Sequence, residues 1–138
     1  MIVILGNVFL CTSIFAVLLF YTDVYKKIIN SHVKFINTIY LLSIIPFFLL
    51  VLGFGISDLS IINVFQNSYV DDPFLFKITS VWGSHEGSIL LWIFLINIYG
   101  IIFLRKNTDK QIHKQIIFIS SLFIIYLVIS SNPFENVK

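Results

Sequence analysis

The side chains of this sequence that could do chemistry crowd into one stretch, residues 81–92, which reads Val-Trp-Gly-Ser-His-Glu-Gly-Ser-Ile-Leu-Leu-Trp. His85 and Glu86 stand next to each other in it and bring an imidazole and a carboxylate to one point of the chain. We expect both in the first turn of a helix, where free N–H groups and the positive end of the helix dipole favour a carboxylate. This stretch is the first candidate for a functional site.

Small residues repeat within the same stretch. Gly83 and Gly87 are four positions apart, and so are Ser84 and Ser88. On one helix this spacing would put all four along a single edge, where another backbone or a flat ligand can approach closely. Such edges are more often seams between packed helices than ligand surfaces, so we favour a packing role.

The sequence offers no constellation for catalysis and no set of metal ligands. It contains no recognisable pair of carboxylates, nucleophile with its base, metal-spaced cluster or phosphate loop. Cys11 is the only cysteine, which excludes an internal disulfide, a CxxC thiol pair and a CxxCH haem-attachment site. The chain is therefore not itself a c-type cytochrome, and we expect binding or assembly rather than catalysis.

The composition predicts a membrane protein. Hydrophobic residues make up 58% and charged residues 12% of the 138 positions, and the mean hydropathy is +0.97. These values exclude an ordinary soluble fold and are typical of a chain that crosses a membrane several times. We predict one all-α membrane domain over residues 1–138, with no role for nucleic acid because the cations sit in short loops.

Four apolar runs predict four transmembrane helices, each near the length of about 20 residues that spans the hydrocarbon core. Their approximate bounds are 2–21, 35–56, 87–104 and 115–131. Residues 57–86 form a loop in which Asp72 is the expected N-cap, and Pro73 the first residue, of a short amphipathic helix. We expect this helix to lie in the membrane interface before the third span. Trp82 and Trp92, ten positions apart, are then an interface anchor and a buried core residue.

Loop charges predict the orientation. The loops after the first and third spans hold seven of the nine Lys and Arg residues, namely Lys26, Lys27, Lys34, Arg105, Lys106, Lys110 and Lys114. By the positive-inside rule these loops face the cytoplasm or matrix, so both termini and residues 57–86 face the periplasm or intermembrane space. We expect His32 and His113, which sit in the basic loops, to be solvated. Lys77 is expected to pair with Asp71 or Asp72 rather than with a propionate or lipid headgroup.

Residues 81–92 resemble the WGxHEGSxLLW signature in the N-terminal region of the CcmF family of cytochrome c haem lyases. Leu5-Gly6-Asn7 resembles the opening of that family, and Asn67-Ser68 followed by Lys77 precedes the signature at the expected spacing. Ser131-Asn132-Pro133-Phe134 resembles the segment that closes the family's fourth span. The resemblance covers essentially the whole chain. Asn7, which lies inside an apolar run, is then either a functional residue or a hydrogen-bonding link between helices.

The resemblance implies a split or truncated form of the family. Family members continue into a Trp-rich domain with haem-binding histidines, and they hold a haem b in the membrane. This sequence has no counterpart of that domain, so we expect it to bind no haem and to catalyse nothing alone, with haem b in the complete assembly. Split forms occur in some mitochondria, so the expected location is the mitochondrial inner membrane or a bacterial cytoplasmic membrane.

Two functions follow from this resemblance. The first is a membrane subunit of a cytochrome c haem lyase, with membrane lipid and a Trp-rich lyase protein as partners. The second is a structural accessory subunit of a respiratory-chain complex, with other subunits of that complex as partners. A channel or transporter is disfavoured because no ionisable residue lies in the middle of a span. The residues expected to contact haem or a partner are Trp82, Gly83, His85, Glu86, Gly87, Ser88 and Trp92. His85 could also be an axial haem ligand, although a hydrogen-bonding role is the more ordinary one.

Overall fold

The described part of the chain, residues 1–23 and 31–137 of a computed structural model, is helical nearly throughout. Its six helices are α1 (Ile2–Tyr21), α2 (His32–Gly55), α3 (Ile62–Asn67), α4 (Phe74–Gly83), α5 (His85–Leu104) and α6 (Lys110–Ser130). Four of them, α1, α2, α5 and α6, are long and apolar enough to cross a membrane. The prediction of an all-α membrane protein with four spans and a short helix before the third is confirmed.

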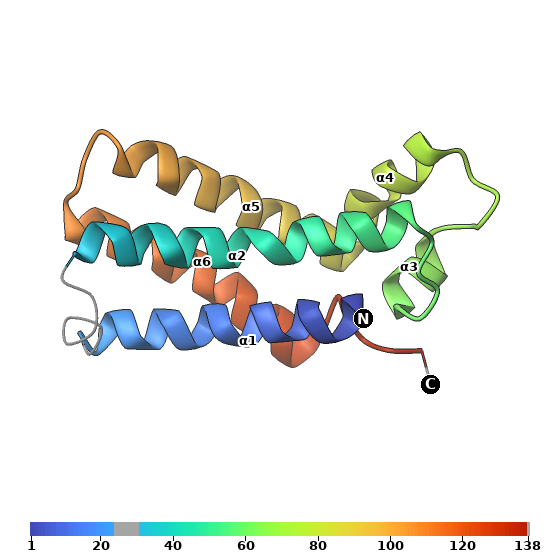
Figure 1. The fold of residues 1–138 in the computed structure, drawn as a ribbon, viewed down its shortest axis with the longest axis horizontal. Helices are drawn as coiled ribbons and strands as arrows, with labels where there is room; N and C mark the ends of the chain where they lie inside the picture. The colour runs from blue at the N-terminus through green and yellow to red at the C-terminus, as the bar shows by residue number, and fades with distance from the viewer. Residues whose placement is uncertain (24–30, 138) are drawn as a thin grey trace.

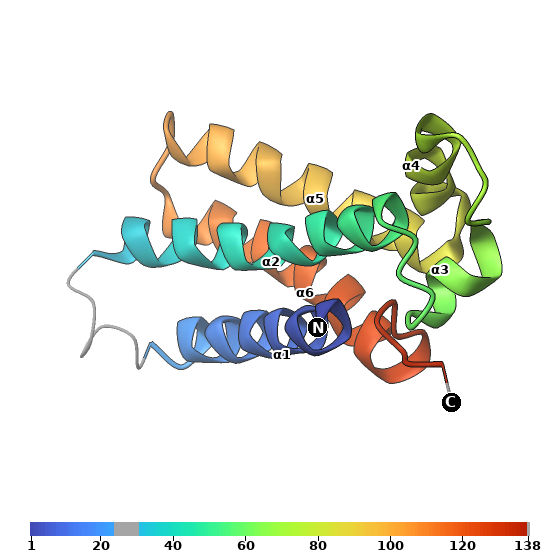
Figure 2. The same cartoon turned by 45° about the vertical axis from the view of Figure 1, so that its right-hand side comes forward.

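The long helices lie side by side, and the connections between them gather at two ends (Figure 1). One end, here called the loop end, holds residues 22–23, 31 and 105–109. The other end, here called the cap end, holds both termini, α3 and α4, and Figure 2 shows α3 and the C-terminal tail together there. The described cations of the two basic loops therefore lie opposite the termini, while Lys26 and Lys27 lie outside the described residues.

Three spans begin earlier than the hydropathy predicts. α2, α5 and α6 start at His32, His85 and Lys110 instead of near 35, 87 and 115. Hydropathy marks only the run that contacts hydrocarbon, whereas helical hydrogen bonding continues into the polar interface until a cap ends it. At α6 that cap is Asp109, whose Oδ1 accepts a hydrogen bond from the backbone N–H of Gln111 at 2.9 Å.

The extra turn of α6 changes the environment of His113. The prediction that His113 is solvated is wrong: its side chain is 0% exposed and faces α2. Its Nδ1 lies 2.7 Å from the Tyr40 hydroxyl, and its Nε2 lies 2.8 Å from the carbonyl oxygen of Asn107. His32 is exposed as predicted, with Nε2 3.3 Å from the carbonyl oxygen of Thr108.

The start of α4 also differs from the prediction. Pro73 is the N-cap, and Asp72 is not, because the Asp72 carboxylate accepts from the backbone N–H of Tyr69 at 2.9 Å and closes the preceding turn. Lys77 donates to the carbonyl oxygen of Val70 at 2.6 Å. Within the described residues it forms no ion pair with Asp71 or Asp72, so the expected carboxylate partner is wrong.

A buried polar pair joins two spans. Asn97 on α5 is fully buried, and its Nδ2 donates to Ser120 Oγ on α6 at 2.7 Å and to the carbonyl oxygen of Ile93 at 2.7 Å. Polar groups inside a bilayer need partners within the protein, because water is not available to them. The apolar core is otherwise made of two clusters, one around Leu50 and Leu90 towards the cap end and one around Phe20 and Ile36 towards the loop end.

Candidate functional site

Residues 81–88 form a bend between two helices, here called the elbow. α4 ends at Gly83, Ser84 has an extended backbone (φ −81°, ψ 154°), and α5 begins at His85. The prediction that Gly83, Ser84, Gly87 and Ser88 line one edge of a single helix is therefore wrong. The spacing of four predicts such an edge only where the helix is continuous, and here it is interrupted.

Two serines build the elbow by satisfying helix ends. Ser84 Oγ accepts from the Gly87 N–H at 3.0 Å, which caps α5, and donates to the carbonyl oxygen of Val81 at 2.8 Å. Ser88 Oγ lies 2.6 Å from the Trp82 carbonyl oxygen and 2.8 Å from that of Ser84. Its hydroxyl proton is therefore shared between the two carbonyl oxygens. These bonds supply partners for carbonyl and N–H groups that helix termini leave open.

The two glycines have different roles. A Cβ added to Gly87 would lie 1.7 Å from the Val81 carbonyl oxygen, so only glycine fits at this position of the elbow. This close contact joins α5 to the last turn of α4, so Gly87 packs against the neighbouring helix of the elbow and not against one of the other spans. A Cβ added to Gly83 would meet nothing within 4 Å, so Gly83 presents an open surface.

Glu86 ties the elbow to two other elements. Its Oε2 accepts from Asn63 Nδ2 of α3 at 2.9 Å, and its Oε1 accepts from Ser131 Oγ, just after α6, at 2.5 Å. It lies in the first turn of α5 as predicted. The three side chains line a polar cavity of about 220 Å³ at the cap end, together with Ile62, Gln66, Ser130, Asn132 and Glu135. Asn63 and Ser131 were not singled out in the sequence as partners of Glu86, because nothing in their spacing reveals the contact.

His85 contacts a different helix. Its side chain is exposed, its Nε2 lies 3.2 Å from the Tyr126 hydroxyl of α6, and the two rings meet edge to face. The hydrogen-bonding role expected for His85 is thus met by a side chain of the same molecule. His32 and His113 lie at the opposite, loop end, so the described histidines do not converge on one haem iron. The residues present do not fit a haem held at both axial positions by this chain.

The other stretches that carry the resemblance also meet at the cap end. Asn132 Nδ2 donates to Asn7 Oδ1 at 2.8 Å, and Asn7 Nδ2 donates to the Phe134 carbonyl oxygen at 3.2 Å. A Cβ on Gly6 would lie 2.4 Å from the buried Phe134 ring, so this ring packs directly on the backbone of α1. Asn7 is therefore a hydrogen-bonding link between α1 and the segment after α6, the second of its two expected roles.

The chain beyond Phe134 completes the cap end. The N–H of Ile62 donates to the carbonyl oxygen of Glu135, and the N–H of Val137 donates to that of Ser60, both at 2.9 Å. These bonds form an isolated antiparallel bridge between Ile61 and Asn136. The start of α1, the α2–α3 link, the elbow and the C-terminal tail are thus joined into one assembly, here called the cap cluster (residues 5–7, 60–63, 84–88 and 131–137).

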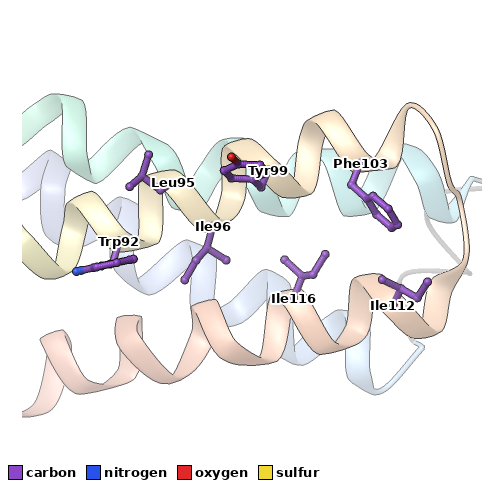
Figure 3. A pocket seen from close by; sticks show the side chains of 7 residues that line it. All are labelled: Trp92, Leu95, Ile96, Tyr99, Phe103, Ile112 and Ile116. Carbon is purple, nitrogen blue, oxygen red and sulfur yellow. The ribbon is translucent and has the colours of Figure 1, made fainter.

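The two tryptophans are both exposed. Trp82 is 44% exposed, and Trp92 is 59% exposed, so the prediction that Trp92 is a core residue is wrong. The face of α5 that packs inward carries Leu90, Ile93 and Asn97, and Trp92 lies to one side of it. Trp92 lines an apolar groove of about 560 Å³ between α5 and α6 (Figure 3). The other lining residues are Leu95, Ile96, Tyr99, Phe103, Ile112 and Ile116.

Comparisons with known proteins identify relatives of the chain. No family model matches it. It is 36% identical over 87 residues to the cytochrome c-type biogenesis protein CycK of Bradyrhizobium diazoefficiens, covering 59% of this chain and 13% of that protein. It is 35% identical over 104 residues to the probable cytochrome c-type biogenesis protein NrfE of Escherichia coli, covering 66% of this chain and 19% of that protein. The chain thus spans less than a fifth of the length of these relatives.

A solved structure has the same fold. The cytochrome c haem lyase CcmF superposes with a TM-score of 0.72 at 23% identity, over 99% of this chain and 24% of that one. The chain is therefore a CcmF-like membrane protein that corresponds to a part of the cytochrome c-type biogenesis proteins.

Proposed function

We propose that this chain is the N-terminal membrane part of a cytochrome c haem lyase, and that it supports the lyase reaction without supplying catalytic residues. The observation that carries this proposal is the cap cluster. Three stretches that resemble the family, around Asn7, Glu86 and Asn132, lie far apart in the sequence and are joined there by side-chain hydrogen bonds. A shared structural unit accounts for the resemblance of all three stretches at once.

The exposed part of the elbow is the proposed contact surface for haem or for a Trp-rich partner. Trp82, Gly83 and His85 are exposed, and they sit on a bend that Ser84, Gly87 and Ser88 hold in shape. Glu86 ties this bend to the rest of the cap cluster. Trp92 belongs to the separate apolar groove, which suits a neighbouring apolar helix or a flat apolar ligand.

Haem binding by the assembly then requires a ligand from elsewhere. His85 could provide at most one axial nitrogen, since the other described histidines lie at the loop end. We infer that the isolated chain binds no haem in stoichiometric amount and that a haem b, where present, is held by the complete assembly. A haem b spectrum in the purified chain that disappears in His85→Ala would contradict this inference.

The proposed location is a mitochondrial inner membrane or a bacterial cytoplasmic membrane, with the cap end on the intermembrane-space or periplasmic side. Arg105, Lys106 and Lys114 at the loop end support this orientation by the positive-inside rule. The cap end carries the acidic residues Asp58, Asp71, Asp72, Glu86 and Glu135.

Identification of co-purifying proteins tests the proposal. The chain is purified in a mild detergent from its own membrane, and its partners are identified by mass spectrometry. A Trp-rich cytochrome c maturation protein together with haem is the expected result. Recovery of respiratory-complex subunits in its place would contradict the proposal and favour the structural accessory subunit. Gly83→Leu should reduce recovery of the partner, whereas Phe15→Ala, on the exposed face of α1, should not.

A further inference from the structure

A cleft of about 350 Å³ lies at the loop end, between the beginning of α2 and the end of α5. Its size falls in the range of small-molecule sites. Its lining residues divide into an apolar set and a polar set. The apolar set is Val33, Ile101 and Leu104, and the polar set is Lys34, Asn37 and Arg105. This cleft is separate from the cap cluster and plays no part in the proposed function.

The polar set is a group of hydrogen-bond donors without an opposing acid. Lys34 and Arg105 are both exposed, and within the described residues neither forms an ion pair. No carboxylate is among the described residues that line the cleft. The contrast with Lys110 is informative, because that nearby cation is paired with Asp23.

These donors suit a phosphate group. A guanidinium offers a planar fork of N–H groups, an ammonium adds a compact charge, and the Asn37 amide adds a neutral donor. Charge-assisted hydrogen bonds of this kind to phosphate oxygens are among the stronger ones in proteins. Lys34 also lies in the first turn of α2, where the helix dipole favours an anion.

Beyond the exposed Thr38, one turn from the cleft, the face of α2 that carries Lys34 is apolar. Lys34, Leu41 and Phe48 are seven positions apart in succession, so they share one face of α2, and Leu41 and Phe48 are each 50% exposed. Beside them, Phe94 of α5 stacks on Phe47 with ring centroids 5.0 Å apart. From Lys34 to Phe48 the helix rises about 21 Å, which exceeds one leaflet of a hydrocarbon core about 30 Å thick.

We propose that this cleft binds the headgroup phosphate of an anionic phospholipid from the leaflet at the loop end, with an acyl chain along Leu41 and Phe48. The cleft has the two features that such a lipid needs. Its cations lie at the helix ends, where the headgroup would bind, and an exposed apolar surface leads from them towards the bilayer centre. Basic pockets between transmembrane helices are known to hold anionic headgroups. A soluble phosphate would bind the cations but would gain nothing from the apolar surface.

The test compares lipids on the full chain in neutral detergent. Native mass spectrometry measures binding of phosphatidylglycerol and of phosphatidylcholine of equal chain length. A surface cation contributes about fivefold to the affinity for an anionic lipid, so two should give a preference of about 25-fold for phosphatidylglycerol. The double variant Lys34→Gln/Arg105→Gln should lose nearly all of it, and Lys34→Arg/Arg105→Lys should keep most of it.

The matched control is Lys106→Gln/Lys114→Gln, which removes the same charge from the loop end outside the cleft. It should retain the preference for phosphatidylglycerol. An equal loss in this control would mean diffuse attraction and would overturn the proposal. So would equal binding of both lipids by the wild-type chain. Displacement of the lipid by millimolar inorganic phosphate at constant ionic strength would assign the cleft to a soluble anion instead.

Discussion

At the scale of single residues, Gly87 has the tightest surroundings in the elbow. The Val81 carbonyl oxygen occupies the place that any side chain would need. Gly83, only four positions earlier, has open space around it. The sequence shows the two glycines as equivalent, and their difference arises from the bend at Ser84.

Gly87→Ala should therefore destabilise the chain, while Gly83→Ala should not. Overpacking a tight site costs about 1–3 kcal/mol, and here the obstacle is backbone that cannot rotate away. Thermal unfolding in detergent should show a clearly lowered Tm for Gly87→Ala and an unchanged Tm for Gly83→Ala. Equal values for the two variants would contradict the geometry of the elbow.

The Glu86 carboxylate links the elbow to α3 and to the segment after α6, and a single substitution tests this link. Glu86→Ala leaves the Asn63 amide and the Ser131 hydroxyl without their acceptor, at a cost of about 1–3 kcal/mol for the buried Asn63 and less for the half-buried Ser131. Hydrogen exchange should become faster in α3 and in residues 131–137. Glu135→Ala is the control, because Glu135 lines the same cavity and bonds to Ile62 through its backbone carbonyl. Unchanged exchange in Glu86→Ala would show that the carboxylate does not hold the cap cluster together.

At the scale of elements, one buried hydrogen-bonded pair joins α2 and α6 at the loop end, beside the apolar packing of Ile117. The Asn107 carbonyl oxygen can only accept, so His113 Nε2 carries a proton, and in a neutral imidazole Nδ1 then accepts from the Tyr40 hydroxyl. Gly100 of α5 lies under the Tyr40 ring, where a Cβ would be 2.5 Å from it. Three spans thus meet around one tyrosine.

Tyr40→Phe should lower the Tm because it leaves His113 Nδ1 buried without a donor. The expected loss is about 1–3 kcal/mol. Tyr99→Phe makes the same chemical change on an exposed face of α5 and should leave the Tm unchanged. If both variants unfold at the wild-type temperature, the hydroxyl does not bond to the imidazole.

The spans could be predicted from sequence, but their rotations could not. A bilayer requires about 20 apolar residues per helix, so hydropathy locates α1, α2, α5 and α6. In α5 nearly every face is apolar, so no periodicity reveals that Trp92 faces outward. The elbow was missed for a related reason. Gly83-Ser84 is only a weak helix breaker, and the spacing of four does not reveal the hydrogen bonds of Ser84 and Ser88 that hold the bend.

At the scale of the whole molecule, both termini, α3 and α4 lie at one end and the described part of the basic loops at the other (Figure 1). This arrangement makes the orientation directly testable in a Cys11→Ser background. A cysteine at Asp71 should react with an impermeant reagent added from the periplasmic or intermembrane-space side, and one at Lys106 should not. The reverse labelling pattern would overturn the proposed orientation.

The central claim is that the elbow is the surface through which this chain joins a cytochrome c haem lyase. Photo-crosslinking from a benzoylphenylalanine placed at Trp82 tests it most directly, with Phe15 on α1 as the control position. The account predicts a crosslink from Trp82 to a Trp-rich cytochrome c maturation protein and none to that protein from Phe15. A crosslink from Trp82 to a respiratory-complex subunit, or equal crosslinking from both positions, would contradict it.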